Sequence, residues 1–99
     1  RNVYLNREQR QNAAVLYKSL HLAGGLILDR QPVEKARKEG VGLLKSNRFV
    51  TAIDYFDIRD TQTLKPVLDT SLKNDILIAA AIHMGKTRLI DNIIIRGKK

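Results

Sequence analysis

The chain contains no cysteine and no tryptophan, and only two of its 99 residues are proline. The absence of cysteine excludes a disulfide-stabilised scaffold, a thiolate metal site and cysteine redox chemistry, and it favours a reducing, cytoplasmic compartment. With aromatic residues at 5% and hydrophobic residues at 43%, the core is expected to consist of Leu, Ile, Val and Ala. A chain of this length supports about one domain with one modest core.

The chain also lacks a long hydrophobic segment. Its longest apolar run, Ile76 to Ile82, is far shorter than the roughly 20 residues that a membrane-spanning helix needs. The first residues contain no apolar region of a signal peptide, and the chain begins with Arg1 rather than Met. We therefore expect no membrane partner, and we expect position 1 to be the boundary of a fragment.

Positive charge is in excess, with 18 Lys and Arg against 10 Asp and Glu and a formal net charge of +8. This charge permits binding to polyanions but carries no information about the fold. Because lysine and arginine also occupy the solvated faces of amphipathic helices, we favour that simpler interpretation and expect no specific nucleic-acid partner. The alternative function is a small basic nucleic-acid-binding or protein-interaction domain without catalytic activity.

Hydrophobic residues recur at helical spacing near the N-terminus. Asn6 and Gln9 can form a variant of the capping box, and the periodic pattern predicts a helix from Arg7 to Leu28. Gly24 and Gly25 lie inside this pattern, where each glycine costs about 1 kcal/mol relative to alanine. Since the periodicity continues past them, we expect another element to pack closely against the helix there.

A second amphipathic helix is predicted after a short connection. Pro32 suits its first turn, and Asn47 is expected to end it in the left-handed conformation. Its apolar stripe consists of Val33, Ala36, Gly40, Leu43 and Leu44.

The C-terminal half has the composition of strands. Residues from Phe49 to Ile58 predict a first strand, and Asp60 to Thr63 predicts a turn. Ile76 to Met84 is apolar on both faces and is expected to be the central strand, followed by a bend at Gly85 and a third strand, Leu89 to Ile95. Because this order leaves no room for parallel crossovers, we predict an α+β fold with two helices packed on one face of a small, mainly antiparallel three-stranded sheet.

The stretch Gly85 to Thr87, Gly-Lys-Thr, has the letters of a phosphate-binding loop. Such a loop requires an earlier glycine, which lets the backbone curl around the phosphate. It also requires a helix directly after the loop. Ala80 occupies the position of the first glycine, and the residues after Thr87 are strand-like. We therefore interpret the glycine as a bend residue, and the charges around it as surface charges or a local ion pair: Lys86, Arg88 and Asp91.

Other catalytic and metal-binding patterns are incomplete. His21 and His83 have no ligand spacing between them and no carboxylate beside them in sequence, so we expect half-buried imidazoles and no metal site. Asp54 and Asp57 are expected on opposite faces of their strand. By this reasoning, the fragment contains no complete catalytic site.

Three segments match landmarks of one known family in the same order. The first is Arg1 to Leu5 with the helix that follows it, and the third is Gly85 to Asn92. The second and weaker one comprises Asp54, Tyr55, Asp60, Thr63 and Leu64. Together they resemble the C-terminal domain of the pantothenate synthetase, or pantoate:beta-alanine ligase, family.

The resemblance implies that residues 1–99 are a single domain, the C-terminal lid of a longer two-domain ligase whose N-terminal Rossmann-like domain is absent from this chain. In the full-length enzyme, ATP, with Mg²⁺, and pantoate are expected to give pantoyl adenylate and pyrophosphate, and beta-alanine then displaces AMP to form pantothenate. The implied partners are these substrates and the N-terminal domain of the same chain. The full-length enzyme is expected to be a cytoplasmic homodimer formed through that domain, whereas the fragment alone is expected to be inactive and to bind no cofactor.

The resemblance also implies one ATP-binding residue. In the family a Met-Ser-Ser-Arg-Asn loop closes on ATP, and its last two members correspond to Arg1 and Asn2 of this chain. The guanidinium of Arg1 is expected to neutralise charge on the phosphates as pyrophosphate leaves. Asn2 is expected to bond the local backbone.

Overall fold

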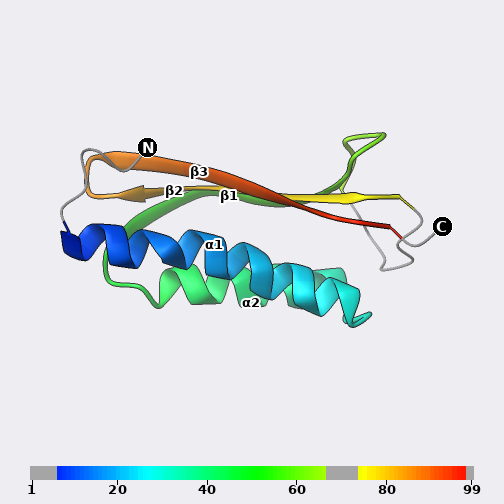
Figure 1. The fold of residues 1–99 in the computed structure, drawn as a ribbon, viewed down its shortest axis with the longest axis horizontal. Helices are drawn as coiled ribbons and strands as arrows, with labels where there is room; N and C mark the ends of the chain where they lie inside the picture. The colour runs from blue at the N-terminus through cyan, green and yellow to red at the C-terminus, as the bar shows by residue number, and fades with distance from the viewer. Residues whose placement is uncertain (1–6, 67–73, 98–99) are drawn as a thin grey trace.

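The structure is a computed structural model that describes residues 7–66 and 74–97, with side chains described from residue 14 onward. Its elements are two helices, α1 (Arg7–Leu28) and α2 (Val33–Lys45), followed by three strands, β1 (Val50–Asp60), β2 (Ile76–Met84) and β3 (Thr87–Ile95). The strands form one antiparallel sheet in the order β1-β2-β3, and both helices lie on the same side of it (Figure 1). The predicted α+β fold is confirmed. None of the helices in the described ranges has the length and apolar character that crossing a bilayer requires.

The connection between the helices is set by backbone geometry at the end of α1. Arg30 has a positive φ of 62°, and its amide donates to the carbonyl of Ile27, while the amide of Gln31 donates to the carbonyl of Leu26. These two bonds form a Schellman motif, which satisfies carbonyls that the helix end would leave unpaired. A left-handed residue, Arg30, thus ends α1, where none was predicted from the sequence.

The ends of α2 differ from the prediction by small shifts. Pro32 is the residue before the helix and not part of its first turn. Asn47 does not adopt the left-handed conformation, because Ser46 ends the helix with ordinary helical angles and the Asn47 side-chain oxygen instead accepts a hydrogen bond from the amide of Phe49 at 2.8 Å. This local bond directs the chain from α2 into β1.

The hydrophobic core lies between the helices and one face of the sheet. It is formed on the helical side by residues such as Leu20, Ile27 and Leu44, all with 0% exposure. Burial of each such side chain stabilises the fold by about 1.5–3 kcal/mol. On the sheet side, alternate residues of β2 face the helices and are at most 3% exposed: Ile76, Ile78, Ala80, Ile82 and Met84.

Two glycines allow the helices to approach the sheet closely. A Cβ atom on Gly40 of α2 would lie 2.5 Å from the ring Cζ of Phe56 in β1, and one on Gly24 of α1 would lie 2.7 Å from Cδ1 of Ile95 in β3. The close packing predicted at the glycine pair of α1 is therefore confirmed for Gly24. Gly25 has no atom within 4 Å of its Cβ position.

Strand β1 contains two β-bulges that change which side chains face the core. In its register with β2, Val50 pairs with Met84 but Ala52 pairs with His83, and the same shift occurs between Ile53 and Tyr55. Thr51 and Asp54 are the extra residues. As a result, the residues of β1 that pack toward the helices have spacings of three and then two: Val50, Ile53, Phe56 and Ile58.

The second bulge overturns one prediction about β1. Simple alternation would place Asp54 and Asp57 on opposite faces of the strand. Because Asp54 is the extra residue of the bulge, both carboxylates lie on the face directed away from the helices, where Asp54 contacts His83 and Asp57 pairs with Ala79.

Candidate functional site

The face of the sheet opposite the helices, here called the open face, is covered by no element in residues 7–66 and 74–97 (Figure 1). Its members follow from strand alternation, because residues of β2 and β3 between the core positions point to the other side. In β2 and β3 they form cross-strand pairs from one end of the sheet to the other: His83 with Arg88, Ala81 with Ile90, Ala79 with Asn92, and Leu77 with Ile94.

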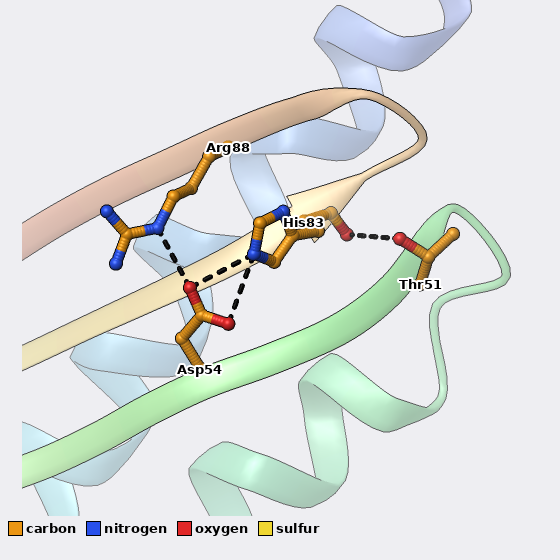
Figure 2. A network of polar contacts seen from close by, with 4 residues as sticks. All are labelled: Thr51, Asp54, His83 and Arg88. Atoms are coloured by element: carbon orange, nitrogen blue, oxygen red, sulfur yellow. Dashed lines mark hydrogen bonds and ion pairs between the residues drawn. The ribbon is translucent and has the colours of Figure 1, made fainter.

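One end of the open face holds a polar cluster with one residue from each strand. The Arg88 Nε donates to Oδ2 of Asp54 at 2.8 Å, and Nε2 of His83 lies 3.1 and 3.0 Å from the two oxygens of the same carboxylate. Figure 2 shows the side chains of Arg88 and His83 converging on the carboxylate of Asp54. The hydroxyl of Thr51 donates to the carbonyl of His83 at 3.2 Å, which adds a contact between β1 and β2. We call Asp54, His83 and Arg88 the Asp54 cluster.

Two features of the backbone bring the Asp54 cluster together. The bulge turns Asp54 to the open face, and the tight turn at Gly85 and Lys86 makes His83 and Arg88 direct cross-strand partners. Gly85 has φ of 59°, a conformation that glycine adopts without strain, which is why this position suits a two-residue hairpin. The predicted bend at Gly85 is therefore confirmed, and strand β3 begins two residues earlier than expected.

Sequence reasoning missed the partners within this cluster. Arg88 was expected to be a surface charge or to form a local ion pair; it is exposed, but its ion pair is with Asp54, 34 residues away. His83 was expected to be a half-buried imidazole, which is confirmed, but its carboxylate partner was not foreseen because strand pairing joins distant segments. The usable signal was the hairpin itself, since residues equally distant from a two-residue turn face each other. No comparable signal identifies Asp54, because its orientation depends on the bulge.

The electrostatics of the cluster favour an ionised Asp54. The hydrogen bond from Arg88 lowers the pKa of the Asp54 carboxyl below its usual value, and the contact with His83 acts in the same direction. The charge of Arg88 is thus paired on its Nε side. Its side chain is nevertheless 47% exposed.

The free end of Arg88 is the chemically distinctive feature of the cluster. Its Nη1 and Nη2 groups have no hydrogen-bond partner among the described residues, and both point away from Asp54 and His83 (Figure 2). By contrast, Arg59 on the same face uses Nε and Nη2 on Asp57 and Nη1 on the carbonyl of Leu64. Arg88 therefore presents an oriented fork that can bind a carboxylate or phosphate through two parallel hydrogen bonds.

The other residues considered from sequence have structural roles or lie elsewhere. Asp60 stabilises the predicted turn after β1, because its Oδ1 accepts from the amides of Gln62 and Thr63. The hydrogen bond that Asn74 donates to Asp60, together with these amides, lowers the pKa of the Asp60 carboxyl. His21 is exposed rather than half-buried.

The Gly-Lys-Thr stretch is a hairpin turn leading into β3, so it is not a phosphate-binding loop. Within the described part of the chain, no three His, Cys, Asp or Glu side chains are grouped as metal ligands would be. Arg1 and Asn2, the residues predicted from the family resemblance, lie outside the described residues. The role of Arg1 in ATP binding therefore stays a prediction.

Comparison with known proteins relates this fold to one enzyme family. The sequence model of the pantoate-beta-alanine ligase family matches residues 1–94. Pantothenate synthetase of Fervidobacterium nodosum is 43% identical over 96 residues, which are 96% of this chain and 33% of that protein. Pantothenate synthetase of Clostridioides difficile is 39% identical over 92 residues, 93% of this chain and 32% of the relative.

Solved structures agree with the sequence comparison. The crystal structure of pantoate-beta-alanine (pantothenate synthetase) from Thermus thermophilus aligns with a TM-score of 0.81 and 29% identity, over 96% of this chain and 33% of that one. The chain thus spans about a third of the length of the relatives it matches. Since the family model matches nearly all of its residues, the chain belongs to the pantoate-beta-alanine ligase family.

Proposed function

We propose that this chain is the C-terminal lid domain of a longer ligase that joins pantoate to beta-alanine at the expense of ATP. The observation that carries the proposal is the family match over residues 1–94, combined with relatives of which this chain spans only about a third. In this proposal residues 1–99 form one domain, and a Rossmann-like N-terminal domain outside this chain holds the nucleotide and substrates.

The proposed reaction has two steps. A carboxylate oxygen of pantoate attacks the α-phosphorus of ATP, and the bond to the departing pyrophosphate breaks, which leaves pantoyl adenylate. The amine of beta-alanine then attacks the acyl carbon, loses a proton, and displaces AMP to give pantothenate. Mg²⁺ would supply charge neutralisation on the phosphates. These groups act in the remainder of the enzyme, because the described residues contain no nucleophile paired with a positioned base.

The proposed contribution of this domain is closure. Closing a lid excludes water from a reactive acyl adenylate, which would otherwise be hydrolysed. Arg1 would reach the nucleotide phosphates in the closed state and stabilise the charge that develops as pyrophosphate leaves. A single contact at one end of a domain cannot offset the entropic cost of capturing a nucleotide, so the fragment alone would neither hold ATP tightly nor form the adenylate.

The proposal extends to location and assembly. The absence of cysteine agrees with a reducing cytoplasmic compartment. The full-length ligase would be a homodimer joined through its N-terminal domains. The alternative, nucleic-acid binding, rests on net charge alone. Bases stack on exposed aromatic side chains, and Tyr55 is the one aromatic residue that the described strands place on the open face.

The test is pantoate-dependent release of pyrophosphate from ATP by the full-length ligase. Replacing Arg1 with Ala should slow adenylation about a hundredfold, which corresponds to roughly 3 kcal/mol of lost transition-state stabilisation. The matched control is Lys38→Ala, which removes the same charge from the exposed surface of α2 and should leave the rate unchanged. Equal rates for the two variants would refute the role of Arg1, and absence of pantoate-dependent pyrophosphate release would refute the ligase assignment.

A further inference from the structure

We propose that the open face of the sheet is the surface on which the remainder of the ligase polypeptide docks, and that Arg88 anchors this contact by binding a carboxylate on the docked part. This inference rests on the proposed function, because it takes the occupant to be the rest of the same ligase. Beyond that function, the open face is assigned as the contact surface and Arg88 as the residue that orients the contact.

Part of the open face is apolar, beside the charged or polar side chains of Asp54, Asp57, Arg59, His83 and Arg88. An antiparallel sheet that faces water on one side normally carries polar residues there. Here Ile90 and Ile94 of β3 occupy open-face positions and are 57% and 56% exposed. Their cross-strand partners on this face are also apolar: Ala81, which neighbouring side chains bury completely, and Leu77, which is half-buried. The run of three isoleucines that ends β3 is thus typical of a strand covered on both faces.

The second argument is the Asp54 cluster at the hairpin end of the same face. Asp54 fixes the guanidinium of Arg88 through Nε, so little side-chain freedom remains to be lost when a partner binds. The two free Nη groups match the two oxygens of a carboxylate. The apolar patch can supply contact area, and Arg88, whose Nη groups are free of described partners, can fix the orientation of the docked part.

The third argument concerns which molecule covers the face. The relatives are long enough that about two thirds of such a ligase lies outside this chain. A covalently joined partner is present at a high effective concentration, whereas a second copy must be captured from solution. Contacts between domains of one chain commonly bury 600–1,500 Å², roughly the scale that one face of a small sheet can provide.

A competing surface exists on the outer side of α1. Tyr17, Leu22 and Leu28 are 55%, 39% and 48% exposed. The ring of Tyr17 already packs against His21 with centroids 4.1 Å apart, and no oriented cation with a free fork accompanies this stripe among the described contacts. We therefore assign docking to the open face and use α1 as the comparison surface in the test.

The test measures thiol labelling in the full-length ligase. This chain has no cysteine, so Ile94→Cys and Leu28→Cys each introduce one thiol at positions of similar exposure in the domain, 56% and 48%. Maleimide labelling followed by peptide-resolved mass spectrometry separates these sites from any other cysteine. We expect Ile94→Cys to react about tenfold or more slowly than Leu28→Cys, because docking must open before the thiol is reached.

A second pair of variants tests the anchor. Adding Arg88→Gln to Ile94→Cys should raise the labelling rate about tenfold, whereas adding Lys38→Gln, which removes an exposed charge from α2, should not change it. Equal labelling by the two cysteine variants, or slower labelling at position 28, would overturn the open-face assignment. Protection that disappears on dilution would overturn the same-chain occupant in favour of a second copy. An unchanged rate with Arg88→Gln would overturn the anchor.

The two proposals can fail separately. Each cysteine variant is assayed for pantothenate formation before labelling. A ligase that forms pantothenate but labels equally at both positions retains the proposed function and loses the docking surface. A protein that forms no pantothenate in its unsubstituted form loses the proposed function, whatever its labelling pattern.

Discussion

The two faces of the same three-stranded sheet differ in almost every physical respect. The face toward the helices carries apolar side chains that are buried or half-buried, with those of β2 at most 3% exposed, and helix glycines bring α1 and α2 into close contact with it. The open face carries small residues, two half-exposed isoleucines and a charged cluster linked across all three strands. The first face therefore holds the domain together, whereas the second is the face that we propose as the docking surface.

The central strand makes this contrast clearest. Neighbouring residues of β2 belong to different faces, so Ile82 is wholly buried against the helices while His83 lies beside a carboxylate on the open side. Substitutions on the two faces should therefore affect different properties.

Truncating a core side chain should have the largest effect on stability. Phe56→Ala removes a ring that is 1% exposed and in contact with α2, so the free energy of unfolding should fall by about 3–5 kcal/mol. Ile90→Ala on the open face should change it by less than about 1 kcal/mol in the 99-residue chain. Urea unfolding followed by circular dichroism measures both. Similar losses for the two variants would show that the open face also supports the fold.

The two glycines of α2 should respond in opposite directions. A methyl group at Gly40 meets the buried ring of Phe56 and should destabilise the domain by about 1–2 kcal/mol, even after the helix-propensity gain. Gly42 is exposed with no atom within 4 Å of its Cβ position, so Gly42→Ala should stabilise the helix by up to about 1 kcal/mol. Thermal unfolding of the two variants compares them directly. Stabilisation by Gly40→Ala would indicate that α2 does not need this close approach.

The smallest effect should appear in the acid dependence of stability. Arg88 and His83 lower the pKa of Asp54 in the folded state, so its contribution is present above the ordinary carboxyl pKa of 3.8 and is lost as pH falls through the lower folded value. As the pH falls from above 3.8 to below the folded pKa of Asp54, the Asp54→Asn variant should therefore lose less stability than the unsubstituted chain. Urea midpoints measured across this range provide the comparison. Parallel pH profiles for the two proteins would contradict the pairing of Asp54.

Most of the fold could be predicted from the sequence because it depends on local periodicity. The helical pattern of α1 predicted its bounds, Arg7 to Leu28, and the apolar run of β2 predicted both its bounds and its central position. The termini of α2 were less accurate, since Asn47 uses its side chain to bond the next turn instead of adopting a left-handed backbone. Asparagine is common in both of these helix-ending conformations, so its presence in the sequence does not distinguish them.

The candidate site could be predicted only in part. The turn at Gly85 was recognisable, and with it the pairing of His83 and Arg88 could have been deduced. The bulge at Asp54 could not, because it arises from fitting Ile53 and Phe56 to the same core face across a non-local strand pair. The role of Arg1 came from family resemblance and lies outside the described residues.

The account is tested most directly by adenylation kinetics of Arg88→Gln in the full-length ligase, measured as pantoate-dependent pyrophosphate release at saturating ATP. If the open face positions this domain for closure, the rate should fall about tenfold or more relative to Lys38→Gln, because closure orients the reacting groups. The urea midpoint should stay close to that of the unsubstituted ligase, since Arg88 is exposed and forms one surface ion pair. An adenylation rate for Arg88→Gln equal to that of Lys38→Gln would contradict the claim that the open face serves the ligase.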